Sequence, residues 1–575
     1  MMENIKEIPY GIANFVEVAE QNMYYVDKTM YLPLLEKQPR NLFFIRPRRF
    51  GKSIFLSMLR AYYDIAQKEK FQKRFGNLWI GSRPTPLQGK FQVVYLDFSR
   101  ASGGSGSLEE NFNNYCDMVM DLFGKVYEPY YFPGFAQKME EQPDFVSKLN
   151  YLNLHAAESG MKLYLIIDEY DNFTNIVLNE QGKDIYHALT HASGFYREIF
   201  KKFKGMFERI FMTGVSPVTL DDLTSGFNIG TNYSLSPKFN EMTGFTEEEV
   251  REMLDYYRSV LPFNHTTDEM IKVMKPWYDN YCFAVKSYGK TTMYNSVMVL
   301  NFISNYIDNE YDIPDSMVET NIRIDYDKMR MLIRHDKEFA HDASIIQQLV
   351  TQGFVIGTLN ENFPAERIND PDNFLSLLFY FGMVTIDGTY DGETKFIIPN
   401  EVVRDQMYTY LLDTYKENDL VYDRYSKGKL ESKLAYHGEY KPYFEYIADC
   451  LKKYSSQRDK QKGEAFVHGF TLAMTSQNKF YCPISELDND GGYADIFLSP
   501  LCDIYKDMVD SYIIELKYCK SQTTDEQVKK LFEEASAQIS RYADSDMVRE
   551  AVKTTKLHKL VVIYRGAEMV ACEEI

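Results

Sequence analysis

The sequence lacks the features that mark membrane, secreted and zinc-binding proteins. It contains no run of about 18 uncharged apolar residues, the length that a transmembrane helix needs. Its first residues, MMENIKEIPYG, lack the basic-then-apolar order of a secretion signal. Its 7 cysteines include no Cys-x-x-Cys pair, which argues against a zinc ribbon and for reduced thiols. These absences predict a cytoplasmic protein without a membrane partner.

Positive charge is also scarce. The chain has 64 Lys and Arg residues against 83 Asp and Glu residues, which gives a formal net charge of −19 at pH 7. Because non-specific binding to nucleic acid depends on basic side chains that neutralise phosphates, an acidic surface opposes it. We therefore expect any contact with DNA or RNA to need a local basic groove, a partner subunit or a metal-filled site.

What is present is the composition of a large globular protein. Apolar residues make up 45% of the chain and aromatic residues 15%, and a length of 575 residues predicts about three domains. Residues 1–285 alternate apolar strands with helical stretches, as an α/β domain does. Residues 286–412 have a mainly helical pattern, and the charged segment 415–433 is the expected border before a second α/β domain over residues 435–575.

Residues 41–60 (NLFFIRPRRFGKSIFLSMLR) have the order of strand, loop and helix that a phosphate-binding loop requires. Backbone N–H groups at the start of the helix and the ammonium of Lys52 would bind the phosphates, and the Ser53 hydroxyl would ligate Mg²⁺. Arg46 stands where the motif GxxxxGK[ST] has its first Gly, so a basic turn before an ordinary helix stays an alternative. The candidate nucleotide-binding residues of this loop are Arg46, Arg48, Arg49, Phe50, Gly51, Lys52 and Ser53.

A second apolar strand supplies two carboxylates. The segment 162–172 (KLYLIIDEYDN) ends its apolar run in Asp168 and Glu169. Asp168 is expected beside the Mg²⁺ ion, and Glu169 is expected to polarise the water that attacks the γ-phosphate. The alternative is a buried parallel strand whose acidic end meets solvent. Thr213, at the end of a third strand over 209–213, would sense the γ-phosphate or cap the strand.

Five segments together resemble the AAA-ATPase-like family of proteins. They are YVDKT at 25–29, RPRRFGKS at 46–53, LIIDEYD at 165–171, TGVSP at 213–217 and WYDNY at 277–281. The resemblance covers most of residues 1–410, and it implies ATP binding on a P-loop core with an additional strand. It also implies that Arg46 is typical of the family, whose loop usually reads RPRRFGKS. We expect at least one of the loop arginines to face the nucleotide or the following domain.

The segment after this core is expected to end in a β-hairpin. Its pattern gives an apolar stretch over 377–386, a turn at Asp387-Gly388 and a strand over 395–399. Helices followed by a hairpin resemble the winged-helix lid that follows such ATPase cores. A winged helix can read DNA, but packing as a regulatory lid is the favoured interpretation here. Within the core, the glycine-serine segment 102–107 is expected to be a flexible loop.

Two strands near the C-terminus carry a second set of charged residues. Asp495 lies in an apolar strand over 492–498, and Glu515 and Lys517 lie in another over 511–518. Side chains two apart on a strand project from the same face, and Asp495 joins that face if the strands pair. Mg²⁺ or Mn²⁺ held by Asp495 and Glu515 would relieve their repulsion, and Lys517 would orient a water. A salt bridge on an exposed strand is the alternative.

This arrangement resembles the core of the PD-(D/E)XK nuclease superfamily, over residues 435–575. The resemblance implies a supporting helix over 463–474 that contributes Glu464, a second helix over 525–542 that contributes Gln538, and a last strand over 559–564. Ala494 stands where the motif name has Pro. The candidate catalytic residues are therefore Glu464, Asp495, Glu515, Lys517 and Gln538 here, and Glu169 in the ATPase-like part.

Two function classes stay open. The first is an ATP-regulated, metal-dependent nuclease, for which the resemblance alone suggests mobile-element biology or defence against phage. The second is an ATP-dependent switch or scaffold whose nuclease-like domain binds nucleic acid or protein without cutting. Residues 462–575 contain 13 Lys and Arg against 19 Asp and Glu, a net charge of −6. A nuclease of this charge would need a basic groove from a protein partner or from a second copy of the chain, or an ATP-dependent rearrangement before it cuts.

Overall fold

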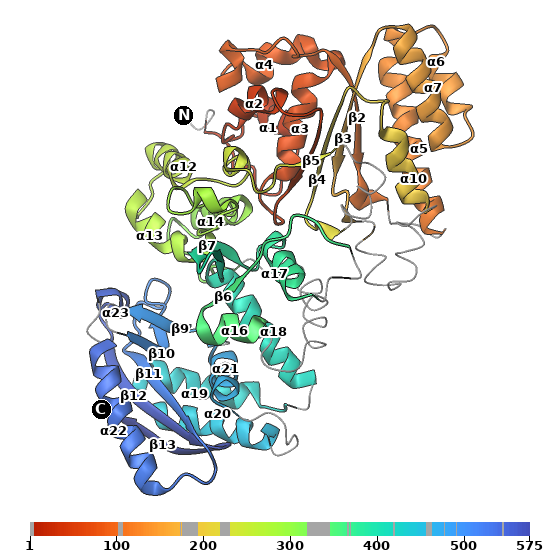
Figure 1. Ribbon diagram of the computed structural model, residues 1–575. Coiled ribbons are helices and arrows are strands. Elements are labelled where there is room, and N and C mark those ends of the chain that lie inside the picture. The colour runs from red at the N-terminus through yellow and green to blue at the C-terminus, as the bar shows by residue number, and fades with distance from the viewer. Residues whose placement is uncertain are drawn as a thin grey trace. The chain divides into compact units, whose positions relative to one another are not determined.

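The computed structural model in Figure 1 describes residues 5–101, 107–172, 174, 194–218, 230–318, 345–364, 367, 370–417, 420–455, 463–476, 478–489, 492–542 and 546–575. The chain divides into two compact units. Unit 1 comprises Met1–Asp312 and Gly357–Lys395, and unit 2 comprises Ile313–Ile356 and Phe396–Ile575. Within the residues described, no helix has both the length and the apolar character that crossing a lipid bilayer requires.

A parallel five-stranded sheet forms the centre of unit 1. Its strands are β1 (Asn41–Ile45), β2 (Phe91–Asp97), β3 (Lys162–Asp168), β4 (Arg209–Gly214) and β5 (Thr231–Asn232). Their order is β2-β3-β4-β1-β5, and their pairings are parallel. β4 therefore lies between β1, which precedes the candidate phosphate-binding loop 46–53 (the phosphate loop), and β3, which ends in Asp168. This is the additional-strand arrangement, and the predicted α/β fold with a parallel sheet is confirmed.

Helices cover both faces of this sheet. Those described in unit 1 are α1 (Phe15–Glu20), α2 (Leu32–Glu36), α3 (Lys52–Tyr63), α4 (Phe71–Phe75), α5 (Leu108–Tyr127), α6 (Phe135–Glu140), α7 (Phe145–Glu158), α10 (Phe195–Phe203), α12 (Glu247–Val260), α13 (Thr267–Tyr278), α14 (Ser296–Asp308) and α17 (Pro371–Tyr380). Figure 1 shows α1–α4 on one side of the sheet and α5, α6, α7 and α10 on the other. Strands that are apolar along nearly their whole length require such cover on both faces. Of the glycine-serine segment 102–107, only Ser107 is described, and it caps α5.

A small three-stranded sheet follows, in the order β6-β8-β7. In chain order, the elements of this region are α16 (Ile345–Gln352), β6 (Phe354–Gly357), α17, β7 (Thr385–Tyr390) and β8 (Glu393–Ile397). Helices and a hairpin are present in the expected order, and their function as a winged-helix lid stays a prediction.

The hairpin turn was predicted at the wrong place. Asp387 and Gly388 lie inside β7, and the chain turns at Asp391-Gly392, whose φ angles are 51° and 90°. Two Asp-Gly dipeptides lie four residues apart, and both suit a two-residue turn with positive φ. Gly388 serves a different purpose, because a Cβ atom there would lie 2.9 Å from the ring of Tyr288. The segment 377–386 also begins in α17 rather than in a strand.

Unit 2 contains a mixed five-stranded sheet. Its strands are β9 (Tyr481–Asn489), β10 (Gly492–Pro500), β11 (Asp510–Cys519), β12 (Lys556–Arg565) and β13 (Glu568–Glu574). The order is β13-β12-β11-β10-β9, with β11 and β12 parallel and the other neighbours antiparallel. The helices are α18 (Glu401–Glu417), α19 (Arg424–His437), α20 (Tyr440–Ser455), α21 (Glu464–Thr475), α22 (Asp525–Tyr542) and α23 (Asp546–Val552). In Figure 1, α22 and α23 lie on one side of the sheet and α19–α21 on the other.

The two outer strands of this sheet, β9 and β13, were not predicted. The segment 559–564 was expected to be the last strand, but β13 follows it and pairs with it. β13 has the sequence EMVACEE, in which acidic residues occupy both ends. Charged side chains are tolerated on an edge strand because one side of it has no neighbour. The alternation of apolar and polar residues that marks a central strand is therefore weak here.

The division into units differs from the expected domain borders. α14, α17 and β7 belong to unit 1, whereas α16 belongs to unit 2, so the region 286–412 contributes to both. The charged segment 415–433 lies inside unit 2 and is largely helical, in α18 and α19. The three-domain division at 1–285, 286–412 and 435–575 therefore stays a prediction.

Candidate functional site

The phosphate loop joins β1 to α3 through residues in the left-handed region of backbone conformation. Arg49 has a φ angle of 68°, and Gly51, which directly precedes α3, has a φ angle of 77°. Glycine adopts this conformation without strain, whereas for other residues it costs roughly 1–2 kcal/mol. The sharp turn makes Lys52 the first residue of α3, so that the N–H groups of the first helical turn lie at the loop.

The ammonium group of Lys52 lies along the loop. The residue is buried, and its Nζ donates to the carbonyl oxygens of Arg46 (3.0 Å) and Pro47 (2.9 Å). Burial lowers the pKa of Lys52, and the charges of Asp168 and Glu169 oppose that effect. An ammonium whose hydrogen bonds go to neutral carbonyls keeps its charge available for an anionic ligand.

The carboxylate of Asp168 interacts with hydroxyl-bearing side chains on two neighbouring elements. It lies at the end of β3, and Thr213 at the end of β4 donates to its Oδ1 at 2.8 Å. The Ser53 side chain, in the first turn of α3, also interacts with this carboxylate. Burial raises the pKa of Asp168, whereas the Ser53 side chain, the charge of Lys52 and the bond from Thr213 lower it. The structure thus brings together three oxygen-bearing side chains of the kind that Mg²⁺ prefers.

Glu169 directly follows Asp168 and has a φ angle of 49°. A left-handed conformation is uncommon for a residue other than glycine and is concentrated at functional sites. Burial raises the pKa of Glu169, and the charges of Arg48 and then Lys52 oppose that effect. Arg48 therefore acts electrostatically on the carboxylate that was predicted to polarise water.

Arg46, predicted to bind the nucleotide, is instead engaged by the protein. It is 1% exposed, and its guanidinium donates to the carbonyl oxygens of Ser234 (2.6 Å) and Phe239 (3.0 Å) and lies 4.2 Å from the ring centre of Phe283. Burial lowers its pKa to about 9. These contacts give Arg46 a structural role in holding β1 to the segment 234–239. Its assignment to nucleotide binding stays a prediction that they do not favour.

Phe50 contributes to the loop through its backbone, because its ring is packed away. The ring is 0% exposed and makes edge-to-face contacts with Tyr281 (4.8 Å between ring centres) and Phe283 (5.3 Å). Tyr281 is the last residue of the WYDNY segment. That segment therefore packs against the phosphate loop, as aromatic residues at a joint between elements commonly do.

The end of β4, which carries Thr213, is held by the last residue of LIIDEYD. The Asp171 carboxylate accepts hydrogen bonds from the backbone amides of Val215 (3.1 Å) and Ser216 (2.6 Å). A Cβ atom on Gly214 would contact Asp171 Oδ1 and would lie 2.5 Å from the ring of Tyr170. The TGVSP segment therefore needs glycine at its second position for close packing.

We expect the Gly214→Ala variant to be destabilised, because the added methyl group has no space. Overpacking of this kind costs about 1–3 kcal/mol, so the thermal midpoint of unfolding should fall. Gly428→Ala is the matched control, because nothing lies within 4 Å of a Cβ atom at that position. Equal midpoints for the two variants in differential scanning fluorimetry would contradict the packing argument.

In unit 2, antiparallel pairing of β10 with β11 brings three charged side chains together. Ile496 pairs with Ile514, which places Asp495 and Glu515 one step beyond this pair. Lys517 Nζ lies 2.7 Å from Glu515 Oε1 and 3.8 Å from Asp495 Oδ2. The backbone amide of Leu516 donates to Asp495 Oδ2 at 2.8 Å. The alternative of an exposed surface salt bridge does not describe this cluster, because Glu515 is 1% exposed.

The charges of this cluster are incompletely balanced. Burial, followed by the negative charge of Asp495, raises the pKa of Glu515 to about 7, although Lys517 opposes this. Burial alone would lower the pKa of Lys517, but the carboxylates of Asp495 and Glu515 outweigh this effect and raise it. The Oε2 atom of Glu515 is buried and has no hydrogen-bond partner among the described residues. An unpaired buried carboxylate oxygen beside a second carboxylate fits a divalent cation.

The protein side chains alone would not complete the coordination of such a cation. In the part of the chain that the structure describes, no group of three or more His, Cys, Asp and Glu side chains is arranged to hold a metal ion. A metal at Asp495 and Glu515 would therefore need backbone, water or substrate oxygens as further ligands, which is usual for Mg²⁺.

Two family models match the chain in these two regions. Residues 9–224 match the family described as "Predicted AAA-ATPase", and residues 462–574 match the "PD-(D/E)XK nuclease superfamily". These are matches to two separate regions of the chain. The first contains the phosphate loop, Asp168 and Thr213, and the second contains Asp495, Glu515 and Lys517.

Individual relatives are more distant. An "Uncharacterized protein in vnfD 5'region" from Azotobacter chroococcum mcd 1 is 26% identical over 283 residues, which is 48% of each chain. This chain thus spans about half the length of that curated relative. Among solved structures, the ORC2 protein of Aeropyrum pernix (ADPNP-ADP complexes) is 11% identical with a TM-score of 0.31, over 67% of this chain and 93% of that one. The ORC1 protein of the same organism, in complex with DNA, is 10% identical with a TM-score of 0.25, over 67% and 92%.

The two supporting residues of the nuclease-like domain lie on α21 and α22. Glu464 is exposed in the first turn of α21. After burial and the charge of Asp495, the charge of Glu464 also raises the pKa of Glu515. Gln538 on α22 has a buried Oε1 without a hydrogen-bond partner among the described residues. α22 packs on the face of β11 that carries Ile513, and the pleat places Glu515 and Lys517 on that same face.

His468 also belongs to this site, and the sequence analysis did not identify it. Its Nε2 donates to the backbone carbonyl of Asp495 at 2.9 Å, and the residue is 7% exposed. Burial lowers the pKa of His468, and the charge of Asp495 opposes this. A spacing of four residues from Glu464 places both on one face of α21, which was the signal available in the sequence.

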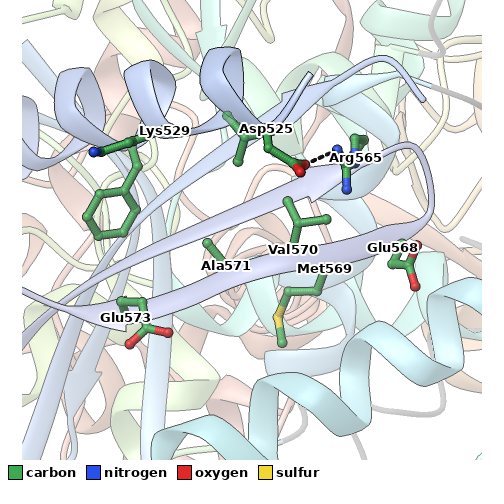
Figure 2. Close-up of a pocket in the computed structure, with 10 residues that line it drawn as sticks. Asp525, Lys529, Arg565, Glu568, Met569, Val570, Ala571 and Glu573 are labelled. Carbon is green, nitrogen blue, oxygen red and sulfur yellow. Dashed lines mark hydrogen bonds and ion pairs between the residues drawn. The ribbon is translucent and has the colours of Figure 1, made fainter. Parts of the chain in front are cut away.

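A groove of about 650 Å³ opens elsewhere on the nuclease-like domain, between α22 and the β12–β13 hairpin. Figure 2 shows the ion pair of Asp525 with Arg565 (2.7 Å), which links the first turn of α22 to the end of β12. The remaining lining residues are Val528, Lys529, Phe532, Glu568, Met569, Val570, Ala571 and Glu573. None of the candidate catalytic residues lines this groove, so it is separate from the Asp495 site.

Proposed function

We propose that this protein binds and hydrolyses Mg·ATP on the 46–53 loop and uses the nucleotide state to control a metal-dependent site that cleaves nucleic acid. The observation that carries the nucleotide half is the convergence of Ser53 and Thr213 on Asp168. In this proposal, Lys52 and the amides of the loop bind the phosphates. Ser53 and Asp168 hold Mg²⁺, which supplies positive charge at the phosphate oxygens. Glu169 orients the attacking water.

The nuclease half is supported by the cluster of Asp495, Glu515 and Lys517. Asp495 and Glu515 would hold one Mg²⁺ or Mn²⁺ ion, with the backbone carbonyl after Glu515 as a further ligand. The ion would supply Lewis-acid activation of the phosphate. Lys517 would position the attacking water, Glu464 would lie near the metal, and Gln538 would orient a phosphate or the strand. His468 would keep the Asp495 backbone in place.

Incubation with nucleic acid tests this function directly. The full chain is mixed with supercoiled plasmid, or with single-stranded DNA or RNA, in Mg²⁺ or Mn²⁺, with and without ATP. The proposal expects metal-dependent cleavage whose rate changes with ATP in the wild type and not in the Lys52→Ala variant. No cleavage of any substrate under any nucleotide condition would contradict the nuclease half.

A second candidate is an ATP-dependent switch whose nuclease-like domain binds without cutting. It is favoured by the charge of −6 over residues 462–575, since cleaving domains that act alone are commonly basic. Under this candidate, nucleic acid or a protein partner is retained in a nucleotide-dependent manner but remains intact. A homo-oligomer that supplies the basic surface would reconcile the acidic charge with cleavage. A setting in mobile-element biology or phage defence stays a prediction from resemblance.

We expect ATP to change the hydrogen exchange of residues 286–412, because this region is proposed to transmit the nucleotide state. The physical basis is that Tyr281, just before it, packs on Phe50 of the phosphate loop. Exchange measured by mass spectrometry should slow in at least part of this region when Mg·ATP is added. The Lys52→Ala variant is the control and should show no change. Identical exchange of the wild type with and without ATP would argue against transmission.

A further inference from the structure

The outer side of the phosphate loop is held by two segments that are distant in the sequence. The carbonyl oxygen of Arg49 accepts hydrogen bonds from Ser296 Oγ (3.0 Å) and from the amide of Val297 (3.3 Å). The next carbonyl, that of Phe50, accepts from the amide of Gly244 at 2.9 Å. Ser296 and Val297 are the first two residues of α14. Successive carbonyls of the loop are therefore fixed by groups outside it.

Fixing these carbonyls also sets the direction of the loop amides. In a trans peptide the C=O and N–H bonds point in opposite directions. Because the oxygens of Arg49 and Phe50 point towards α14 and Gly244, the amides of Phe50 and Gly51 point away from them. Among the described residues, these two amides donate to no backbone acceptor. Successive free amides at a helix N-terminus form the cradle that binds an anion.

The conformation held in this way is strained. Arg49 is in the left-handed region with a φ angle of 68°, although it carries a side chain. Such a residue keeps this conformation only when its surroundings determine it. Both hydrogen bonds from the start of α14 go to the carbonyl of this residue. The amino end of α14 is therefore placed to maintain the strain.

The start of α14 is itself fixed by other parts of unit 1. The side chain of Asn295 caps the helix by accepting from the amide of Met298 at 3.3 Å, and its backbone amide donates to the carbonyl of Tyr278 at 2.9 Å. Tyr294 exchanges two backbone hydrogen bonds with Phe245, of 2.7 and 3.1 Å. A displacement of α13 or α14 would thus reach Arg49 through a short series of hydrogen bonds.

We propose that Ser296, together with the amide of Val297, is a positioning residue for nucleotide binding, which holds the segment Arg49–Gly51 in its phosphate-binding conformation. This rests on the proposed binding of ATP and deepens it, because it makes the position of α14 a determinant of nucleotide affinity. Ser296 does not touch the phosphates in this account. It acts through the carbonyl of Arg49.

Equilibrium titration with a fluorescent ADP or ATP analogue tests the proposal. Ser296→Ala removes one of the two donors to Arg49 and should weaken nucleotide binding by about three- to tenfold. Ser304→Ala, on the same helix, is the matched control and should bind as the wild type does. Thermal melting of both variants reports whether the fold is retained.

A double-mutant cycle separates positioning from a general structural effect. Arg49→Gly removes the need for a restraint, because glycine adopts a positive φ angle without strain. The loss caused by Ser296→Ala should therefore be smaller in the Arg49→Gly background than in the wild type. The cycle cancels any affinity that the Arg49 guanidinium contributes by itself.

The outcomes distinguish this inference from the function on which it rests. A wild-type protein that binds no nucleotide would overturn both. A wild type that binds nucleotide, with Ser296→Ala unaffected or equally damaging in both backgrounds, would overturn the positioning role alone. A larger loss in the wild-type background than in the Arg49→Gly background supports it.

Discussion

The Lys52→Ala variant is expected to lose nucleotide binding. Lys52 is buried, and its ammonium donates only to the carbonyls of Arg46 and Pro47 among the described residues, so its charge is available to a phosphate. Loss of charge-assisted hydrogen bonds to two phosphate groups is worth about 3 kcal/mol or more, which corresponds to a roughly 100-fold increase in Kd. Isothermal titration with ATP and Mg²⁺ measures this change.

The control for this experiment is Lys70→Ala, which removes an exposed lysine of the same unit. It should bind ATP as the wild type does. Tight ATP binding by a folded Lys52→Ala protein would overturn the assignment of the phosphate loop. Glu169→Gln provides the complementary result, because it should retain binding and slow hydrolysis by about 100-fold or more, as loss of a general base does.

The geometry of the candidate phosphate loop was predictable because its signal is local. Gly51, Lys52 and Ser53 are adjacent in the chain, and an apolar strand before them and helical periodicity after them indicate the geometry. The parallel sheet then places Asp168 and Thr213 near that loop, since the carboxyl ends of parallel strands meet at one edge. The sequence motif and the geometry of a parallel sheet were together sufficient to predict where these residues lie.

The surroundings of the loop were not predictable in the same way. Arg46 carries the same sequence signal as its neighbours, but its partners Ser234 and Phe239 are 188 and 193 residues away. Phe50 is packed by Tyr281, which is also remote in the sequence. Whether a residue of a loop faces the ligand or the core depends on such tertiary contacts. Spacing within the loop contains no information about them.

The nuclease-like site shows the same limit. The period of two along β11 correctly placed Glu515 and Lys517 on one face, and antiparallel pairing brought in Asp495. His468 was missed because its contact is with a backbone carbonyl, which no side-chain pattern reveals. The edge strand β13 was missed because its acidic ends weaken the apolar signal.

We expect Asp495→Ala and Lys517→Ala each to remove metal-dependent cleavage of nucleic acid. The Lys517 ammonium contacts Glu515 Oε1 and lies near Asp495, so metal binding and water positioning depend on one cluster. Groups that act as a unit cannot be removed singly without losing most of the activity. Rates should fall by at least about 100-fold. Lys520→Ala, which changes an exposed lysine just after β11, is the matched control and should cleave normally.

The pH dependence of stability gives a readout that does not require cleavage. The pKa of Glu515 is raised from 4.5 to about 7 by burial and then by Asp495, although Lys517 opposes this. Between these two values the folded protein keeps a proton that the unfolded chain has released. The contribution of Glu515 to stability therefore falls as pH rises from 4.5 to about 7. Glu515→Gln has no such group, so without divalent metal it should melt at a higher temperature than the wild type at pH 8.

Addition of Mn²⁺ then separates the two candidate functions. A cation that binds the folded site stabilises it by mass action, so Mn²⁺ should raise the melting temperature of the wild type at pH 8 and raise that of Glu515→Gln less. Cleavage without this difference would place the active metal elsewhere, and a crystal soaked in Mn²⁺ would show density away from Asp495 and Glu515. Stabilisation without cleavage, in every nucleotide state, would mean that the cluster binds metal in a domain that holds its partner intact. Because the melting experiment reports on the cation and the cleavage experiment on the reaction, the two results cannot be confused.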